Sequence, residues 1–131
     1  MFGAYTFGPF KLNYRGGGEF VETLGVGALL PWLNAYAVGG VLWTESYGWV
    51  LAGSTFMALS SALASGLADE ESDQAGGKRT FTTMFGNPRI RLWVDRALAG
   101  GALVWVAMPV FAPELGMAGV LAGGVAFYFW F

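Results

Sequence analysis

The sequence predicts an all-α protein that crosses a membrane as a polytopic bundle of about four helices. Only 12% of its 131 residues are charged, whereas 55% are hydrophobic; a soluble domain usually carries about 25% charged residues. Its apolar segments approach the length of about 20 residues that a helix needs to cross the hydrocarbon layer. Because backbone groups inside lipid must be hydrogen-bonded within the segment, we expect these segments to be helices. We expect a single transmembrane domain over residues 1–131.

Four apolar segments are expected to form these helices, in the ranges 20–43, 47–68, 90–111 and 115–131. The connection 69–89 is the one long loop that the pattern predicts. Pro31 and Pro109 are expected to kink their helices; a carbonyl freed beside a cavity is the alternative role of Pro31. Small residues recur in all the segments, which favours close packing of helix backbones in lipid.

All seven Lys and Arg residues fall on one side of the predicted bundle, namely Lys11, Arg15, Lys78, Arg79, Arg89, Arg91 and Arg96. The opposite connections carry only Glu45 and Glu114. The positive-inside rule therefore puts the N-terminus and the 69–89 loop in the cytoplasm, where Trp93 would anchor the next helix. Because Met1–Pro9 lacks a basic start and a cleavage site, we expect the first apolar helix to direct insertion.

The composition excludes several kinds of chemistry. The chain has no His and no Cys, which excludes disulfides, thiolate catalysis, an imidazole base and the usual zinc ligands. Any metal must be held by oxygen, which favours magnesium, calcium or manganese. The cations form no basic surface interleaved with aromatic residues, so we expect no binding to nucleic acid.

The longest polar stretch, residues 69–80, begins where an apolar segment ends. Asp69 and Asp73 are one helical turn apart and are expected to face the same way. Magnesium suits such a pair, because it takes one or two carboxylates and completes its shell with water and phosphate oxygens. Lys78 and Arg79 follow a glycine turn and could bind the oxygens of a diphosphate. A solvated acidic helix end followed by a basic membrane anchor fits these residue types equally well.

Two further pairs of charged residues have simpler interpretations. Glu19 and Glu22 are expected to interact with the dipole at the start of the first helix; the alternative for Glu22 is that it faces the cavity with a functional role. Arg91 and Asp95 are expected to form a helix-stabilising ion pair, because they are four residues apart.

The polar stretch resembles the second aspartate-rich motif of the UbiA superfamily of intramembrane prenyltransferases, in the pattern Asp69-x-x-x-Asp73-x-x-x-Gly77-Lys78-Arg79-Thr80. A second segment is similar to the Tyr-x-Gly-x-Gly-Glu/Asp segment of the 1,4-dihydroxy-2-naphthoate polyprenyltransferase branch, at Tyr14-Arg15-Gly16-Gly17-Gly18-Glu19. Together these matches lie within residues 9–86.

The resemblance implies a magnesium-dependent transferase of a bacterial inner membrane. Its substrates would be a polyprenyl diphosphate and an aromatic quinone precursor, as in menaquinone biosynthesis. It implies magnesium ligands at Asp69 and Asp73 and diphosphate contacts at Lys78, Arg79, Arg15 and Tyr14. It assigns no catalytic residue.

The family's first motif, Asn-Asp-x-x-Asp-x-x-x-Asp, is absent from the sequence, which therefore resembles the C-terminal half of such an enzyme. Three arrangements remain open. The chain is a partial sequence of a full enzyme, a subunit of a split enzyme whose second chain carries the first motif, or a non-catalytic half-length relative. The last would assemble with a larger membrane complex that binds pigment or lipid.

Overall fold

The structure, a computed structural model, describes residues 12–130 apart from the side chains of residues 13, 116, 127, 129 and 130. The expectations for Met1–Pro9, Lys11 and Phe131 lie outside the described residues. Within these limits every regular element is helical, which confirms the all-α class. The elements are α2 (Leu12–Arg15), α3 (Gly18–Leu24), the π-helix η1 (Gly25–Leu29), α4 (Leu30–Gly39), α5 (Glu45–Ala68), α6 (Glu70–Ala75), α7 (Phe81–Phe85), α8 (Asn87–Phe111), the 3₁₀ helix η2 (Pro113–Leu115) and α9 (Gly116–Trp130).

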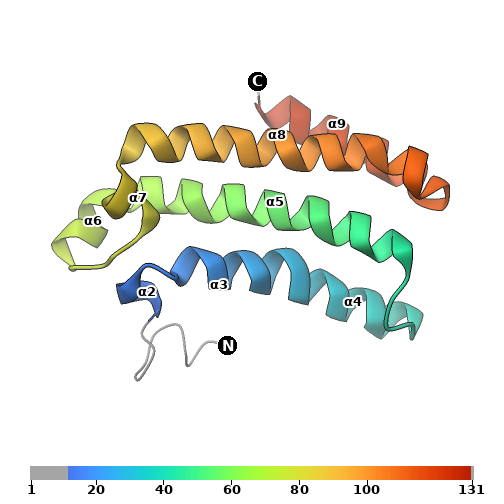
Figure 1. Ribbon diagram of the computed structural model, residues 1–131, viewed down its shortest axis with the longest axis horizontal. Coiled ribbons are helices and arrows are strands. Elements are labelled where there is room, and N and C mark those ends of the chain that lie inside the picture. Colours follow the sequence, from blue (N-terminus) through green and yellow to red (C-terminus); the bar gives the residue numbers. More distant parts are fainter. Residues whose placement is uncertain (1–11, 131) are drawn as a thin grey trace.

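Three long rods lie side by side (Figure 1). The first is the continuous run α3–η1–α4, the second is α5, and the third is α8. The middle rod, α5, contacts both of the others, and α9 packs against α8 on the far side of this layer. The short helices α2, α6 and α7 gather at one end of the rods. This end brings together segments that are distant in the sequence.

Two of the rods have the length and apolarity that a membrane crossing needs. Helix α5 has 24 residues and a mean hydropathy of 1.5, and α8 has 25 residues and a mean hydropathy of 1.4. These helices correspond to the expected spans 47–68 and 90–111. The first rod is divided by η1, and α9 has 15 residues, so within residues 12–130 the structure supports two of the four expected spans by length and composition.

Two expected boundaries are wrong. The first rod ends at Gly39 rather than at residue 43, because Gly40 adopts a left-handed conformation with φ of +67° and closes α4. The connection 69–89 is not one loop but contains α6 and α7. Thr80 begins α7 with a reciprocal cap, in which its Oγ1 accepts from Thr83 N–H at 3.4 Å and its own N–H donates to Thr83 Oγ1 at 2.9 Å. Helices this short have no apolar periodicity for a sequence pattern to reveal.

Pro31 explains the π-helix in the first rod. Proline lacks an N–H, so it cannot donate to the carbonyl four residues earlier, which belongs to Gly27. The backbone widens there, and Leu30 N–H bonds to the carbonyl of Gly25. Two hydroxyls of α5 donate to the freed Gly27 carbonyl, from Ser54 at 2.6 Å and from Thr55 at 3.3 Å. The freed carbonyl therefore joins the first two rods.

Gly27 also sets how closely these rods approach. A Cβ added at Gly27 would lie 2.7 Å from both Thr55 Cα and Ala58 Cβ. Because Thr55 Cα belongs to the backbone of α5, it cannot move without shifting the rod. Glycine at this position therefore permits the contact, as expected for helices packed through small residues.

We expect Gly27→Ala to destabilise the protein by about 1–3 kcal/mol through overpacking. The matched control is Gly124→Ala in α9, where a Cβ would meet nothing within 4 Å. Thermal unfolding of the purified chain in detergent should give a lower midpoint for Gly27→Ala and an unchanged or slightly higher midpoint for Gly124→Ala. Equal midpoints for the two variants would contradict the close approach of the rods.

Candidate functional site

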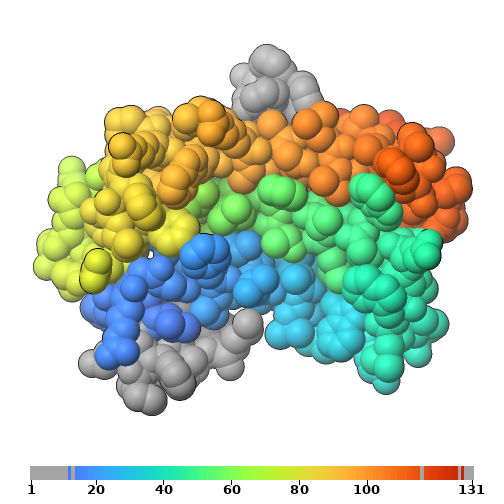
Figure 2. All heavy atoms as spheres, in the orientation of Figure 1, coloured from blue at the N-terminus to red at the C-terminus, as the bar shows by residue number. Residues whose placement is uncertain are grey.

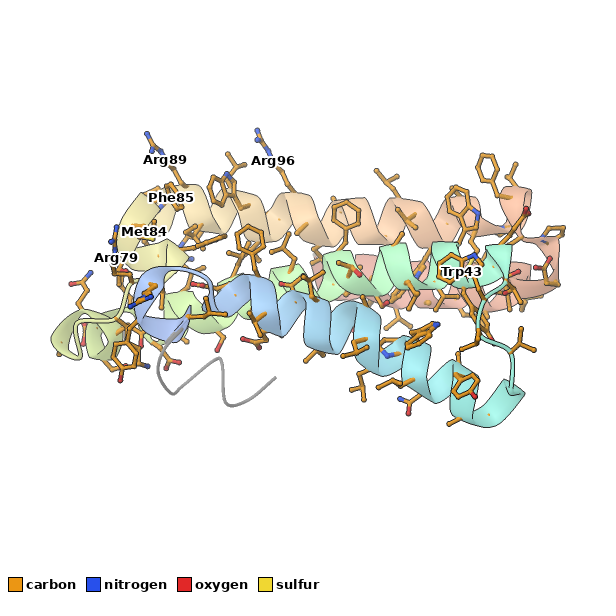
Figure 3. All side chains as sticks on the ribbon, turned by 60° about the horizontal axis from the view of Figure 1, so that its bottom comes forward. Trp43, Arg79, Met84, Phe85, Arg89 and Arg96 are labelled. Atoms are coloured by element: carbon orange, nitrogen blue, oxygen red, sulfur yellow. The ribbon has the colours of Figure 1, made fainter. Side chains whose placement is uncertain are left out.

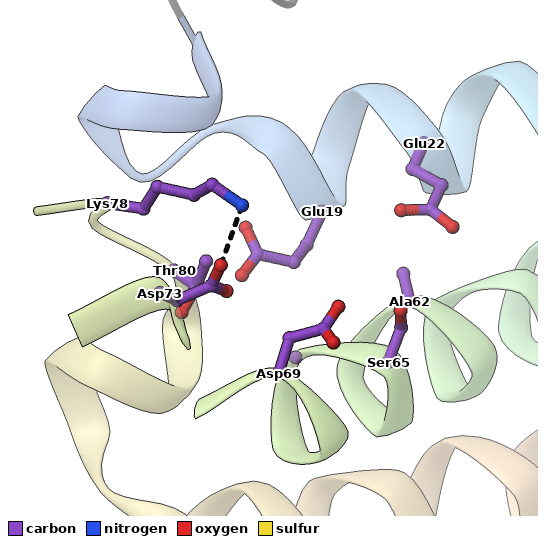
Figure 4. Close-up of a pocket in the computed structure, with 9 residues that line it drawn as sticks. Glu19, Glu22, Ala62, Ser65, Asp69, Asp73, Lys78 and Thr80 are labelled. Atoms are coloured by element: carbon purple, nitrogen blue, oxygen red, sulfur yellow. Dashed lines mark hydrogen bonds and ion pairs between the residues drawn. The ribbon is translucent and has the colours of Figure 1, made fainter. Parts of the chain in front are cut away.

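A small acidic cleft lies at the end of the rods where α2, α6 and α7 gather (Figure 4). Its volume is about 70 Å³, and its walls come from α3, α5 and the segment after α5. Five charged side chains line it, namely Glu19, Glu22, Asp69, Asp73 and Lys78. The cleft thus combines residues from both segments that carry the family resemblance.

Asp69 and Asp73 both reach this cleft, although they do not share one regular helix. Helix α5 ends at Ala68 and α6 begins at Glu70, with Asp69 as the residue between them. The turn is nevertheless preserved, because Asp73 N–H donates to the Asp69 carbonyl at 2.8 Å. The side chain of Asp69 is exposed, whereas Asp73 is only 3% exposed. The two carboxylates therefore face the same space in different environments.

Lys78 forms an ion pair with the buried carboxylate. Its Nζ lies 2.7 Å from Asp73 Oδ1, and the Lys78 N–H donates to the Asp73 carbonyl at 2.9 Å. The hydrogen bond to Asp73 raises the pKa of Lys78 above its ordinary value of 10.5; desolvation opposes this rise, and the charges of Asp73, Tyr14 and Asp69 add to it. Since a raised lysine pKa contributes stability that is lost only as the pH rises past it, the pair persists throughout the neutral range.

Glu19 has a partner that the sequence does not reveal. It lies in the first turn of α3, as expected for a carboxylate that interacts with the dipole of its own helix. Its side chain, however, crosses to another element, where its Oε1 accepts from Phe81 N–H at 2.6 Å. Phe81 is the first residue of α7, and Glu19 is only 7% exposed. The buried carboxylate therefore holds the start of α7 against α3.

The glycine-rich turn before α3 brings the two segments into contact. Gly16 has φ of +82°, and a Cβ added there would lie 2.9 Å from Met84 Sδ and 3.5 Å from the Arg79 carbonyl. Figure 2 shows the start of the described chain lying directly against the segment around α7. A side chain at residue 16 would be strained at this φ and would displace the Met84 side chain, so the turn favours glycine.

The other predicted ligand-binding residues lie outside the cleft. Arg79 is exposed and projects from the surface of this end (Figure 3), so it does not line the cleft beside Lys78. Arg15 and Tyr14 are exposed on α2 and do not line it either. Glu70, in the same acidic run, accepts from Asn87 Nδ2 at 2.9 Å.

Two buried hydroxyls near this end of α3 and in α7 were not expected. The Oγ1 atoms of Thr23 and Thr82 are buried without a hydrogen-bond partner among the described residues. A Cβ added at Gly66 would lie 3.1 Å from Thr82 Oγ1 and 4.0 Å from Glu19 Oε1, which places Thr82 close to the cleft wall. In the sequence, Thr23 could have been linked to Glu19 only by their spacing of four residues, which places them on one face of α3.

The cleft does not contain a complete metal site. No group of three or more Asp or Glu side chains among the described residues is arranged to hold an ion. Asp69 and Asp73 nevertheless supply oxygen donors of the kind that magnesium takes from a protein when water and phosphate provide the rest. The donor set therefore fits magnesium bound together with a phosphate ligand.

No protein-family model, curated protein or solved structure matches the chain. The family resemblance therefore rests on the two short sequence segments alone.

We expect Glu19→Ala to loosen α7, because the Phe81 N–H loses a hydrogen bond to a buried carboxylate, worth about 1.5–3 kcal/mol. Hydrogen–deuterium exchange should become faster in residues 80–86 and remain unchanged in the middle of α5. Glu22→Ala is the matched control, because Glu22 lines the same cleft from the same helix but is exposed. Equal exchange at residues 80–86 in the two variants would show that Glu19 does not hold α7.

Proposed function

We propose that the chain is part of a UbiA-type prenyltransferase, which transfers a polyprenyl group from its diphosphate to an aromatic quinone precursor with magnesium. The observation that carries this proposal is the meeting of the two resembling segments, 14–19 and 69–80, at one acidic cleft. Glu19 from the first segment and Asp73 and Lys78 from the second line the same space. If the two segments resembled the family motifs only by chance, there would be no reason for them to lie together in the fold.

The residues of the cleft have distinct roles in this proposal. Asp69, exposed at the opening, and Asp73, buried behind it, would hold magnesium directly or through water. A magnesium ion bound there would supply positive charge to the diphosphate as its bond to the allylic carbon breaks. Lys78 lies at the same opening. When a diphosphate binds, the Lys78 ammonium can leave its ion pair with Asp73 and bind a diphosphate oxygen instead. Glu19 keeps the segment that carries Lys78 against α3.

The size of the cleft supports a shared site. A volume of about 70 Å³ is small for a polyprenyl diphosphate, so the proposal includes another segment that would complete the binding site. The first aspartate-rich motif, which is absent from this sequence, would supply it from the N-terminal half, on the same polypeptide or on a second chain.

The distribution of charge supports a membrane orientation for the proposed four-span bundle. Lys78, Arg79, Arg89 and Arg91 lie at the same end as the cleft, whereas the opposite connections carry Glu45 and Glu114. By the positive-inside rule the cleft would lie at the cytoplasmic face, and we propose a bacterial inner membrane, as the family resemblance implies. The first rod and α9 would then cross beside α5 and α8.

We expect Asp69→Ala and Asp73→Ala each to weaken magnesium-dependent binding of a polyprenyl diphosphate by at least about tenfold, because each removes a metal ligand. Calorimetric titration of the purified assembly, with and without magnesium, measures this binding. Glu71→Ala is the control: Glu71 belongs to the same acidic run but does not line the cleft. Unimpaired binding in both aspartate variants would remove the metal-ligand proposal.

Lys78→Gln tests the ion pair separately. Because Lys78 competes with a metal for Asp73 Oδ1, its removal should raise the affinity of the cleft for Mn²⁺ alone. The same variant should bind the diphosphate less tightly, since a cation at the opening is lost. Paramagnetic resonance measures free Mn²⁺, and calorimetry measures diphosphate binding. A decrease in both affinities would mean that Lys78 supports the metal site instead of competing with it.

The Asp73–Lys78 ion pair also favours a second candidate function. Because it neutralises one of the two proposed ligands, the chain is also suited to be a non-catalytic subunit that assembles with a larger membrane complex. Purification with a retained partner, together with no magnesium dependence in any of the assays above, would favour this candidate.

A further inference from the structure

An apolar groove runs beside the end of the bundle and shares no lining residue with the acidic cleft. Its volume is about 320 Å³, and it lies between α3, α5, α7 and α8. Aromatic and aliphatic side chains form its walls, among them Phe20, Phe56, Leu59 and Trp93. Arg96 is the one charged residue among those that line it.

One end of the groove is a cluster of interlocked aromatic rings. The Phe81 ring meets Phe20 edge-on with centroids 5.1 Å apart and lies 6.3 Å from Trp93. Phe85 lies 5.2 Å from Trp93. Helix α7 therefore presents its first N–H to Glu19 in the cleft and its rings to the groove, and the two sites lie on different sides of it.

Arg96 brings an unpaired cation to this apolar surface. It is exposed and has no hydrogen-bond or ion-pair partner among the described side chains. Arg89, two helical turns earlier, is also exposed and has no ion-pair or hydrogen-bond partner within the described part of the chain, and Figure 3 shows both projecting from the same side of α8. The neighbouring Asp95 points about 100° around the helix from Arg96, so it does not neutralise this side of α8.

Arg91 is different, although it belongs to the same helix. Its Nε donates to Asn87 Oδ1 at 2.7 Å, so the expected pair with Asp95 is not formed. Arg91 does not line the groove. It provides a matched cation for comparison with Arg96.

The positions along the rods suit a lipid. Arg96 lies about 13 Å along α8 from Asn87, and its side chain is tilted back toward the Arg89 end, as helical side chains are. On α5 the groove continues to Phe56, about 18 Å from the end of that helix. An occupant would therefore have its anionic part near Arg89 and Arg96 and its apolar part along Leu59 and Phe56.

We propose that this groove binds one anionic phospholipid, with its phosphate at Arg89 and Arg96 and an acyl chain along the wall formed by Phe20, Leu59 and Phe56. Charge complementarity commits the site to an anionic lipid, because Arg96 is the one charged residue that lines this otherwise apolar groove and Arg89 projects from the same side of α8. The inference rests on the membrane insertion in the proposed function, but not on the magnesium site.

The test is native mass spectrometry of the full chain in neutral detergent, with equal amounts of phosphatidylglycerol and phosphatidylcholine of identical chains and no magnesium or prenyl diphosphate. We expect retention of phosphatidylglycerol over phosphatidylcholine. Arg96→Gln should retain about fivefold less phosphatidylglycerol, which corresponds to the loss of one cation near an anionic surface. Arg96→Lys should keep most of the binding. Arg91→Gln, with the same change in charge, should bind as the unmodified chain does.

Three results would overturn the proposal. The first is equal retention of the two lipids by the unmodified chain. The second is an equal loss in Arg91→Gln and Arg96→Gln, which would indicate a diffuse effect of charge. The third is displacement of the lipid by an equal concentration of glycerol phosphate, which would show that the groove does not hold the acyl chain. Because Asp69 and Asp73 are unchanged throughout, failure here leaves the magnesium proposal to its own test.

Discussion

The hydrogen bond from Phe81 N–H to Glu19 is the contact on which this end of the molecule depends. Helix α7 has five residues, too few to be stable alone, so its position follows from its cap and its contacts. Thr80 fixes its backbone start, and Glu19 ties that start to α3. The acidic cleft lies on one side of this junction and the aromatic groove on the other. One buried carboxylate therefore organises both of the surfaces to which we assign binding.

The long rods depend on a different constraint, the need to satisfy buried backbone groups. Pro31 leaves the Gly27 carbonyl without its helical donor, and hydroxyls of α5 replace it. Because residue 27 is glycine, the two rods come close enough for those hydroxyls to reach. At the opposite end, Ser46 donates to Glu114 and joins the start of α5 to the connection after α8. Small polar side chains thus fix the arrangement of rods whose surfaces are mostly apolar.

The two faces of the cleft end carry opposite charge. Glu19, Glu22, Asp69 and Asp73 gather in the cleft, where Lys78 is held by one of them. Arg89 and Arg96 project from α8 (Figure 3), and neither of them lines the cleft. A magnesium-bound diphosphate suits the first environment and an anionic lipid suits the second, so the proposed ligands would not compete.

The sequence by itself determined what depends on neighbours along the chain. The length of the apolar segments predicts the helical class and the two long helices α5 and α8. The spacing of one helical turn between Asp69 and Asp73 predicts that their side chains face the same space. Only the tertiary structure decided which distant segments meet. It sends Glu19 to α7, separates Arg79 from the adjacent Lys78, and pairs Arg91 with Asn87 instead of Asp95. Helical spacing fixes relative direction over one or two turns, whereas the direction of a residue in a tight turn depends on packing across the fold.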